Sequence, residues 1–154
     1  MEIYKAIIAG FATVISVIVG IYIKNHLDNK KEIKINEAIR DAVTGKWKGI
    51  LSQLVEGTIE NLEVELNLKV NGAAISGVGM ALRNGRSIYV TLSGEFHSLR
   101  YLRIDYENRD KAILQFGTFI FQLSGDALAL SGHLVGKGHL TERIINASVQ
   151  LTKC

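Results

Sequence analysis

The chain contains few residue types that could carry out chemistry, and their spacing argues against catalysis. Residues 136–139, Gly-Lys-Gly-His, resemble a fragment of a phosphate-binding loop, but no helical pattern follows them closely. His133 and His139 have no cysteine or paired carboxylate beside them that would complete a metal site. No nucleophile elbow, Walker loop or dinucleotide-binding fingerprint occurs. We therefore expect no enzyme activity, no catalytic residues, no cofactor and no metal, and we look for a binding function.

Cationic side chains gather around three predicted turns, the first of which is Asn84-Gly85. In an antiparallel meander, alternate turns fall at the same end, so these cations would share one mouth of the domain. Arginine forks match the geometry of phosphate, and a focused cationic rim favours a phosphate-bearing ligand. The alternative is that these charges only keep hairpin tips soluble. The residues expected to bind the ligand are Arg83, Arg86, Arg109, Lys111, Lys137 and His139.

A period of two dominates the chain from residue 45 onward and predicts strands. It is clearest over residues 62–70, where leucine and valine alternate with polar residues before Asn71-Gly72 turns the chain. Eight strands joined by short links favour an antiparallel all-β domain, an eight-stranded up-and-down barrel of lipocalin or avidin type, with an open sandwich as the alternative. The expected strands are 46–55, 61–70, 73–82, 87–97, 101–107, 112–123, 127–135 and 142–152.

The inward positions of such a barrel are almost wholly apolar. This lining suits a filled core and equally suits a lipid-binding cavity. Trp47 and Tyr106 have the inward phase and are the aromatic residues best placed to stack on a flat ligand, so we include them among the expected ligand contacts. The other inward residues are Val64, Leu66, Leu68, Ile88, Val90, Leu92, Leu102, Ile104, Leu128, Leu130, Val149 and Leu151.

Residues 113–123 are apolar on both faces, because Phe119 and Phe121 have one phase and Phe116 and Ile120 the other. A strand of this kind needs cover outside the barrel, either from a helix over residues 36–43 or from another subunit. We expect Phe119 and Phe121 to take part in homo-oligomerisation.

Residues 6–23 form an uncharged run of 18 apolar or small residues, bounded by Lys5 and Lys24. As a helix this run would extend roughly 27 Å, close to the hydrocarbon thickness of a bilayer. We expect an uncleaved single-pass anchor, with a cleaved signal peptide as the alternative. Lysines after the run predict that the barrel stays in the cytoplasm. Ala12, Ser16 and Gly20 have the spacing of a helix-association face.

The predicted organisation is an anchor over 1–24, a charged connector with a short helix over 25–44, and a barrel over 45–154. This order, with residues 45–51 reading Gly-Lys-Trp-Lys-Gly-Ile-Leu, resembles the membrane-anchored β-barrel effectors of bacterial cyclic-oligonucleotide anti-phage defence, the CBASS type. The resemblance implies a protein of the bacterial inner membrane. Its barrel would bind a cyclic nucleotide, not a nucleic-acid polymer, and would oligomerise to disrupt the bilayer.

Two other functions remain open from the residues themselves. One is a membrane-tethered, lipocalin-like barrel that binds a lipid or another apolar ligand. The other is a membrane-tethered interaction module whose apolar strand over 113–123 associates with a partner.

Overall fold

The computed structural model describes residues 35–138 and 144–154. The predicted anchor, with Ala12, Ser16 and Gly20, lies outside the described residues, and so does His139. In the described ranges, no helix has both the length and the apolar character needed to cross a membrane.

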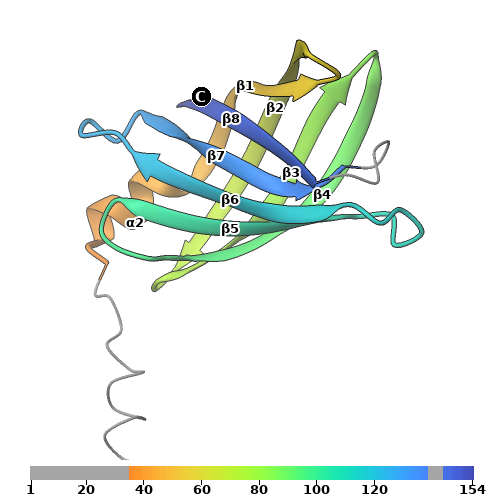
Figure 1. The fold of residues 1–154 in the computed structure, drawn as a ribbon. Helices are drawn as coiled ribbons and strands as arrows, with labels where there is room; N and C mark the ends of the chain where they lie inside the picture. Colours follow the sequence, from red (N-terminus) through yellow and green to blue (C-terminus); the bar gives the residue numbers. More distant parts are fainter. Residues whose placement is uncertain (1–34, 139–143) are drawn as a thin grey trace, which may run out of the picture. The chain divides into compact units, whose positions relative to one another are not determined.

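Eight antiparallel strands form a closed barrel, as the period-two pattern predicted (Figure 1). Each strand pairs with the next in sequence, and β1 pairs with β8 to close the ring. Closure leaves no free edge, which is why a sheet of eight strands needs no covering layer at its sides. The strands are β1 (Gly45–Val55), β2 (Thr58–Asn71), β3 (Ala74–Arg83), β4 (Arg86–Phe96), β5 (Tyr101–Asn108), β6 (Phe116–Leu123), β7 (Ala129–Lys137) and β8 (Ile144–Lys153).

Turn chemistry sets the register of the first hairpins. Glu56-Gly57 and Asn84-Gly85 are two-residue links in which both residues have positive φ. This is the backbone conformation of the hairpin turns that match strand twist. Between β2 and β3 the link is Gly72-Ala73 rather than the predicted Asn71-Gly72, because Asn71 still pairs with Ala74. Gly72 supplies the positive φ there.

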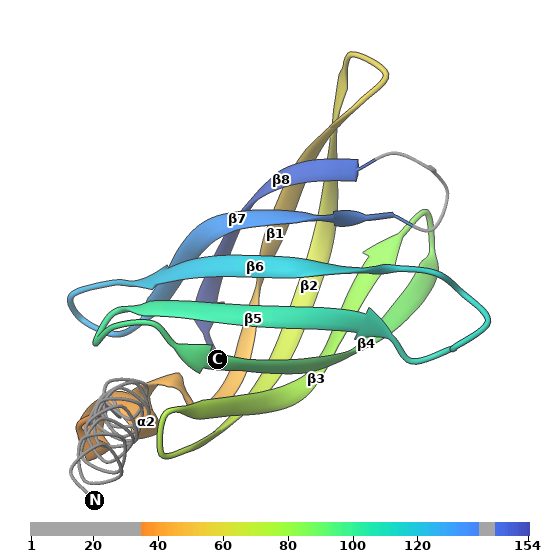
Figure 2. The same ribbon diagram turned by 60° about the horizontal axis from the view of Figure 1, so that its bottom comes forward.

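Helix α2 (Glu37–Val43) closes one end of the barrel (Figure 2). The Asn36 side chain caps it by accepting a hydrogen bond from the Ala38 amide at 3.0 Å. At its other end Val43 is fully buried, and the Trp47 indole donates a hydrogen bond of 2.9 Å to the Val43 carbonyl. The Lys153 ammonium donates to the carbonyls of Asp41 and Ala42. The helix expected at 36–43 is therefore confirmed, and it acts as a plug.

Several predicted strand ends differ from the structure. The second strand begins at Thr58 rather than at residue 61, which places Glu60 on a strand. The sixth strand begins at Phe116 rather than at residue 112, because residues 109–115 form a loop held by Asn108 and Asp110. Leu128, expected inside, is 58 % exposed because it precedes β7 and lies in the turn. The expected inward phase of Trp47 and Tyr106 is confirmed, since both are buried.

The role expected of Phe119 and Phe121 in oligomerisation does not fit the barrel. Both rings are buried inside it, stacked with their centroids 5.2 Å apart, so neither is available to another subunit. The outward positions of β6 belong to Phe116 and Ile120, which are about half exposed, at 49 % and 59 %. Strand parity, which places alternate residues on opposite faces, is the reason for this correction.

Candidate ligand-binding site

A cavity of about 880 Å³ opens at the mouth opposite α2. The interior is packed at the α2 end, where Trp47, Leu68 and Phe121 are fully buried. At the other end the interior is open, and the β1–β2 hairpin, the β3–β4 hairpin and the β5–β6 loop surround the opening. Its lining residues are Leu51, Gln53, Val55, Leu62, Val64, Leu66, Met80, Ala81, Arg83, Asn84, Arg86, Ser87, Ile88, Tyr89, Val90, Tyr106, Asn108, Arg109, Asp110, Ile113, Gln115, Phe119, Leu134, Gly138 and Ile145.

Tyr106 contributes an aromatic ring to the cavity wall, tilted against Phe119 with ring centroids 5.2 Å apart. Two glycines make room for it. A Cβ on Gly117 would lie 2.7 Å from Tyr106 Cε1, and one on Gly136 would lie 2.5 Å from the hydroxyl oxygen. Burial raises the pKa of Tyr106 to about 12, so the hydroxyl is neutral at physiological pH. It is therefore able to donate a hydrogen bond to a ligand.

A polar network of three inward-facing residues lies on β1, β2 and β3 near the open mouth. Arg83 donates to both carboxylate oxygens of Glu60, from Nε at 2.8 Å and from Nη2 at 2.9 Å. Gln53, which is buried, donates to Glu60 Oε2 at 2.7 Å. The hydrogen bonds from Arg83, and then from Gln53, hold the pKa of Glu60 below its usual value.

A second network holds the β5–β6 loop beside the cavity. Asn108 is buried; its side chain donates to Gln115 Oε1 at 2.8 Å and accepts from the Asp110 amide at 2.8 Å. Asp110 in turn accepts from the Ala112 amide at 3.0 Å. These bonds position Arg109 and Asp110 at the rim, where both line the cavity.

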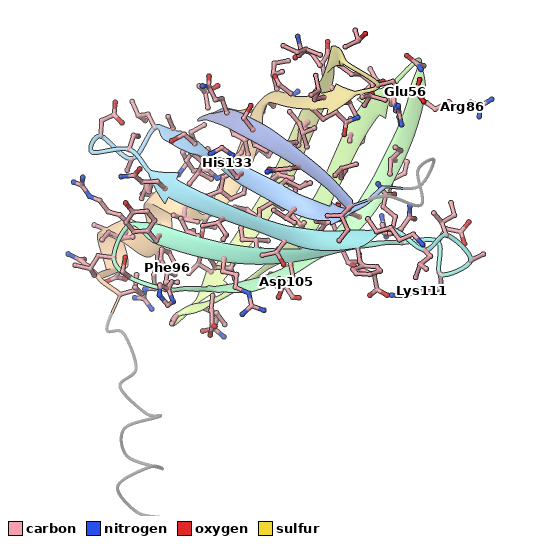
Figure 3. All side chains as sticks on the ribbon, in the orientation of Figure 1. Glu56, Arg86, Phe96, Asp105, Lys111 and His133 are labelled. Carbon is pink, nitrogen blue, oxygen red and sulfur yellow. The ribbon has the colours of Figure 1, made fainter. Side chains whose placement is uncertain are left out.

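The structure brings together four of the predicted ligand contacts: Arg83, Arg86, Arg109 and Tyr106 all line the cavity. Figure 3 shows Arg86 at the tip of the β3–β4 hairpin, extending away from the barrel.

The other predicted contacts within the described residues are absent from the cavity lining. Lys111 is in the β5–β6 loop (Figure 3). Its ammonium pairs with Glu107 at 2.6 Å. Lys137 ends β7 and is absent from the lining, although its neighbour Gly138 is present. Trp47 is fully buried at the closed end, against α2 and away from the cavity.

Sequence reasoning did not include Gln53, Glu60 or Asn108 among the expected ligand contacts. Glu60 has the same strand parity as Leu62 and Val64, and Gln53 has the parity of Trp47 and Leu51. Polar residues at inward positions are the signal that would have identified them, because an inward polar group needs a partner or a ligand.

We expect acid to destabilise the barrel partly through Glu60. A carboxylate whose pKa is lowered by folding stabilises the native state above its unfolded pKa, and loses that contribution as pH falls through its folded pKa. The free energy of unfolding should therefore decline below about pH 4.5, the ordinary value for glutamate.

Urea denaturation at pH values from 7 to 2.5 measures this effect. Glu60→Gln and Arg83→Gln should each make the decline shallower, since either change removes the pair. Unchanged slopes in both variants would contradict the assignment.

Comparison with known proteins gives the fold alone. No family model matches the chain, and no curated protein matches it. Among solved structures, EF1p2_mFAP2b bound to DFHBI is similar with a TM-score of 0.61 and 11 % identity, over 75 % of this chain and 98 % of that one. A redesigned β-barrel is similar with a TM-score of 0.59 and 8 % identity, over 75 % and 95 % of the two chains. The described part of this chain is thus an eight-stranded antiparallel β-barrel.

Proposed function

We propose that the barrel is a receptor for a small amphipathic ligand with an apolar or aromatic body and an anionic end. The observation that carries this proposal is the cavity, whose lining combines an apolar floor with three arginines, Arg83, Arg86 and Arg109. Its volume of about 880 Å³ falls within the range of small-molecule sites. The ligand's body would lie against Tyr106 and Phe119, with its charge at the mouth.

A cyclic nucleotide is the first candidate, as the resemblance to CBASS effectors implies. Arg86 and Arg109 support it, because neither forms an ion pair with another described residue and both are exposed at the rim. In this proposal the bases stack in the cavity and the phosphates meet the arginines. The single-pass anchor, the cytoplasmic location, homo-oligomerisation and membrane disruption in anti-phage defence belong to the same proposal.

A fatty acid or similar lipid is the second candidate, supported by the aliphatic residues that line the inner cavity, among them Leu62, Val64 and Leu66. EF1p2_mFAP2b, a barrel of similar fold, is bound to DFHBI, which is consistent with small-molecule binding by this architecture.

Calorimetric titration of the full chain with cyclic di- and trinucleotides and with fatty acids tests the proposal. The decisive variant is Val64→Trp, which adds a large ring to the cavity wall. It should weaken binding of the true ligand at least tenfold, or about 1.4 kcal/mol. Val78→Trp makes the same change on the outer face of β3, where the side chain is 43 % exposed, and should leave binding unchanged.

Equal affinity in both tryptophan variants would contradict binding inside the barrel. Absence of binding by either ligand class would contradict the proposed function.

A further inference from the structure

Glu60 forms hydrogen bonds with two residues of the cavity lining, Gln53 and Arg83. It projects inward from β2 and is the acceptor in these bonds. It is not itself part of the lining. Its side chain is 24 % exposed and that of Arg83 is 21 % exposed, so the pair is largely withdrawn from solvent.

Arg83 and Glu60 form a bidentate pair. Arg83 uses Nε and Nη2, which form one edge of the guanidinium, to hold both oxygens of Glu60. A bidentate contact of this kind is also how arginine recognises the carboxylate or phosphate of a ligand. An internal carboxylate therefore occupies one of the two edges with which Arg83 could bind an anionic ligand in a bidentate manner.

We propose that Glu60 is a specificity-determining residue that competes with anionic ligands for Arg83. By occupying this edge and adding a negative charge, it lowers the affinity of the cavity for an anion relative to a neutral ligand with the same body. The inference rests on the proposed function, since it concerns which ligand charge the same cavity accepts.

Three other charged residues of the cavity lining, Arg86, Arg109 and Asp110, are more exposed than Arg83 and Glu60. Arg86 and Arg109 lie at the exposed rim, where solvent and salt screen them, and Asp110 lies beside Arg109. Solvent weakens the effect of a rim charge on a bound ligand, whereas a charge in a partly withdrawn pair is screened less. The deeper Glu60–Arg83 pair is therefore the one expected to discriminate.

Two probes of nearly identical shape isolate the effect of charge: 1-naphthalenesulfonate, an anion, and 1-naphthalenesulfonamide, which is neutral. Both are titrated by calorimetry into the full chain in a non-ionic detergent. The same titration of Val64→Trp measures binding to detergent and to sites outside the cavity, and this signal is subtracted. Glu60→Gln should tighten sulfonate binding about tenfold, while sulfonamide binding changes less than twofold. In the double variant Glu60→Gln with Arg83→Gln, the gain should disappear, because the released donors are gone.

Glu65→Gln is the matched control. Glu65 pairs with Lys48 at 2.6 Å, with both side chains about half exposed, so its substitution removes the same charge without touching the cavity. It should leave both affinities unchanged. Near-ultraviolet circular dichroism verifies that each variant retains fixed packing, and Glu60→Ser replaces the glutamine variant if that one does not fold.

The outcomes separate the two proposals. If the folded variant at position 60 shows no selective gain for the sulfonate, or Glu65→Gln shows the same gain, the role of Glu60 is refuted while the receptor proposal stands. If the wild-type chain binds neither probe and neither candidate ligand, the receptor proposal fails and this inference fails with it.

Discussion

Replacing Trp47 with alanine should lower the free energy of unfolding by about 3–5 kcal/mol, the usual cost of removing a large buried aromatic side chain. Trp47 is fully buried, and its indole holds the Val43 carbonyl at the junction of α2 and β1. The Lys153 ammonium lies 5.7 Å from the centre of its ring. The substitution therefore creates a cavity and removes one of the side chains that hold α2 against the barrel, another being Lys153.

Urea denaturation followed by circular dichroism measures this loss. Phe116→Ala is the control, because that ring is 49 % exposed on the outside of β6 and should cost less than about 1 kcal/mol. A Trp47→Ala variant as stable as the control would show that α2 does not depend on this contact.

Gly49→Ala should destabilise the barrel by about 2–3 kcal/mol, the upper part of the usual range for overpacking. A Cβ at this position would lie 1.9 Å from the Gln150 carbonyl oxygen and 2.8 Å from Leu151 Cα. These are backbone atoms of β8, so relief requires the two strands that close the ring to move apart. Gly49 pairs with Leu151 in that closing ladder.

Gly125→Ala provides a matched comparison at a position with space. The nearest atoms to a Cβ there are 3.8 Å away, at the guanidinium of Arg100. Its melting temperature should stay close to that of the wild type, while Gly49→Ala melts several degrees lower. Equal melting temperatures would mean that the β1–β8 ladder accommodates a methyl group.

The barrel was predictable from sequence because its signals are local. Alternation gives the inward face of each strand, and the Asn84-Gly85 pair specifies a two-residue hairpin. Errors arose where an alternating pattern continued beyond a strand. Leu128 has the phase of Leu130 but precedes β7, and the loop at 109–115 is maintained by side-chain bonds from Asn108 that periodicity does not report.

The site was predictable only in part. Hairpin alternation correctly brings Arg83, Arg86 and Arg109 to one mouth, because it depends only on strand order. It gives no information on pairing between side chains. Arg83 bonds to Glu60, 23 residues away in the sequence, whereas Lys111 bonds to Glu107, four residues before it. The sequence alone does not distinguish a paired cation from an unpaired one.

The ladder between β1 and β8 also has a consequence for synthesis. Because Gly49 pairs with Leu151, ribosomes must add about a hundred residues after the first strand before its partner exists, which takes roughly 5–20 s at ordinary elongation rates. During that interval the amides and carbonyls on one side of β1 have no partner strand. A nascent chain of this topology is thus most vulnerable to chaperone capture or aggregation late in translation, and premature termination within β8 would be far more harmful than loss of an equal length from a hairpin tip.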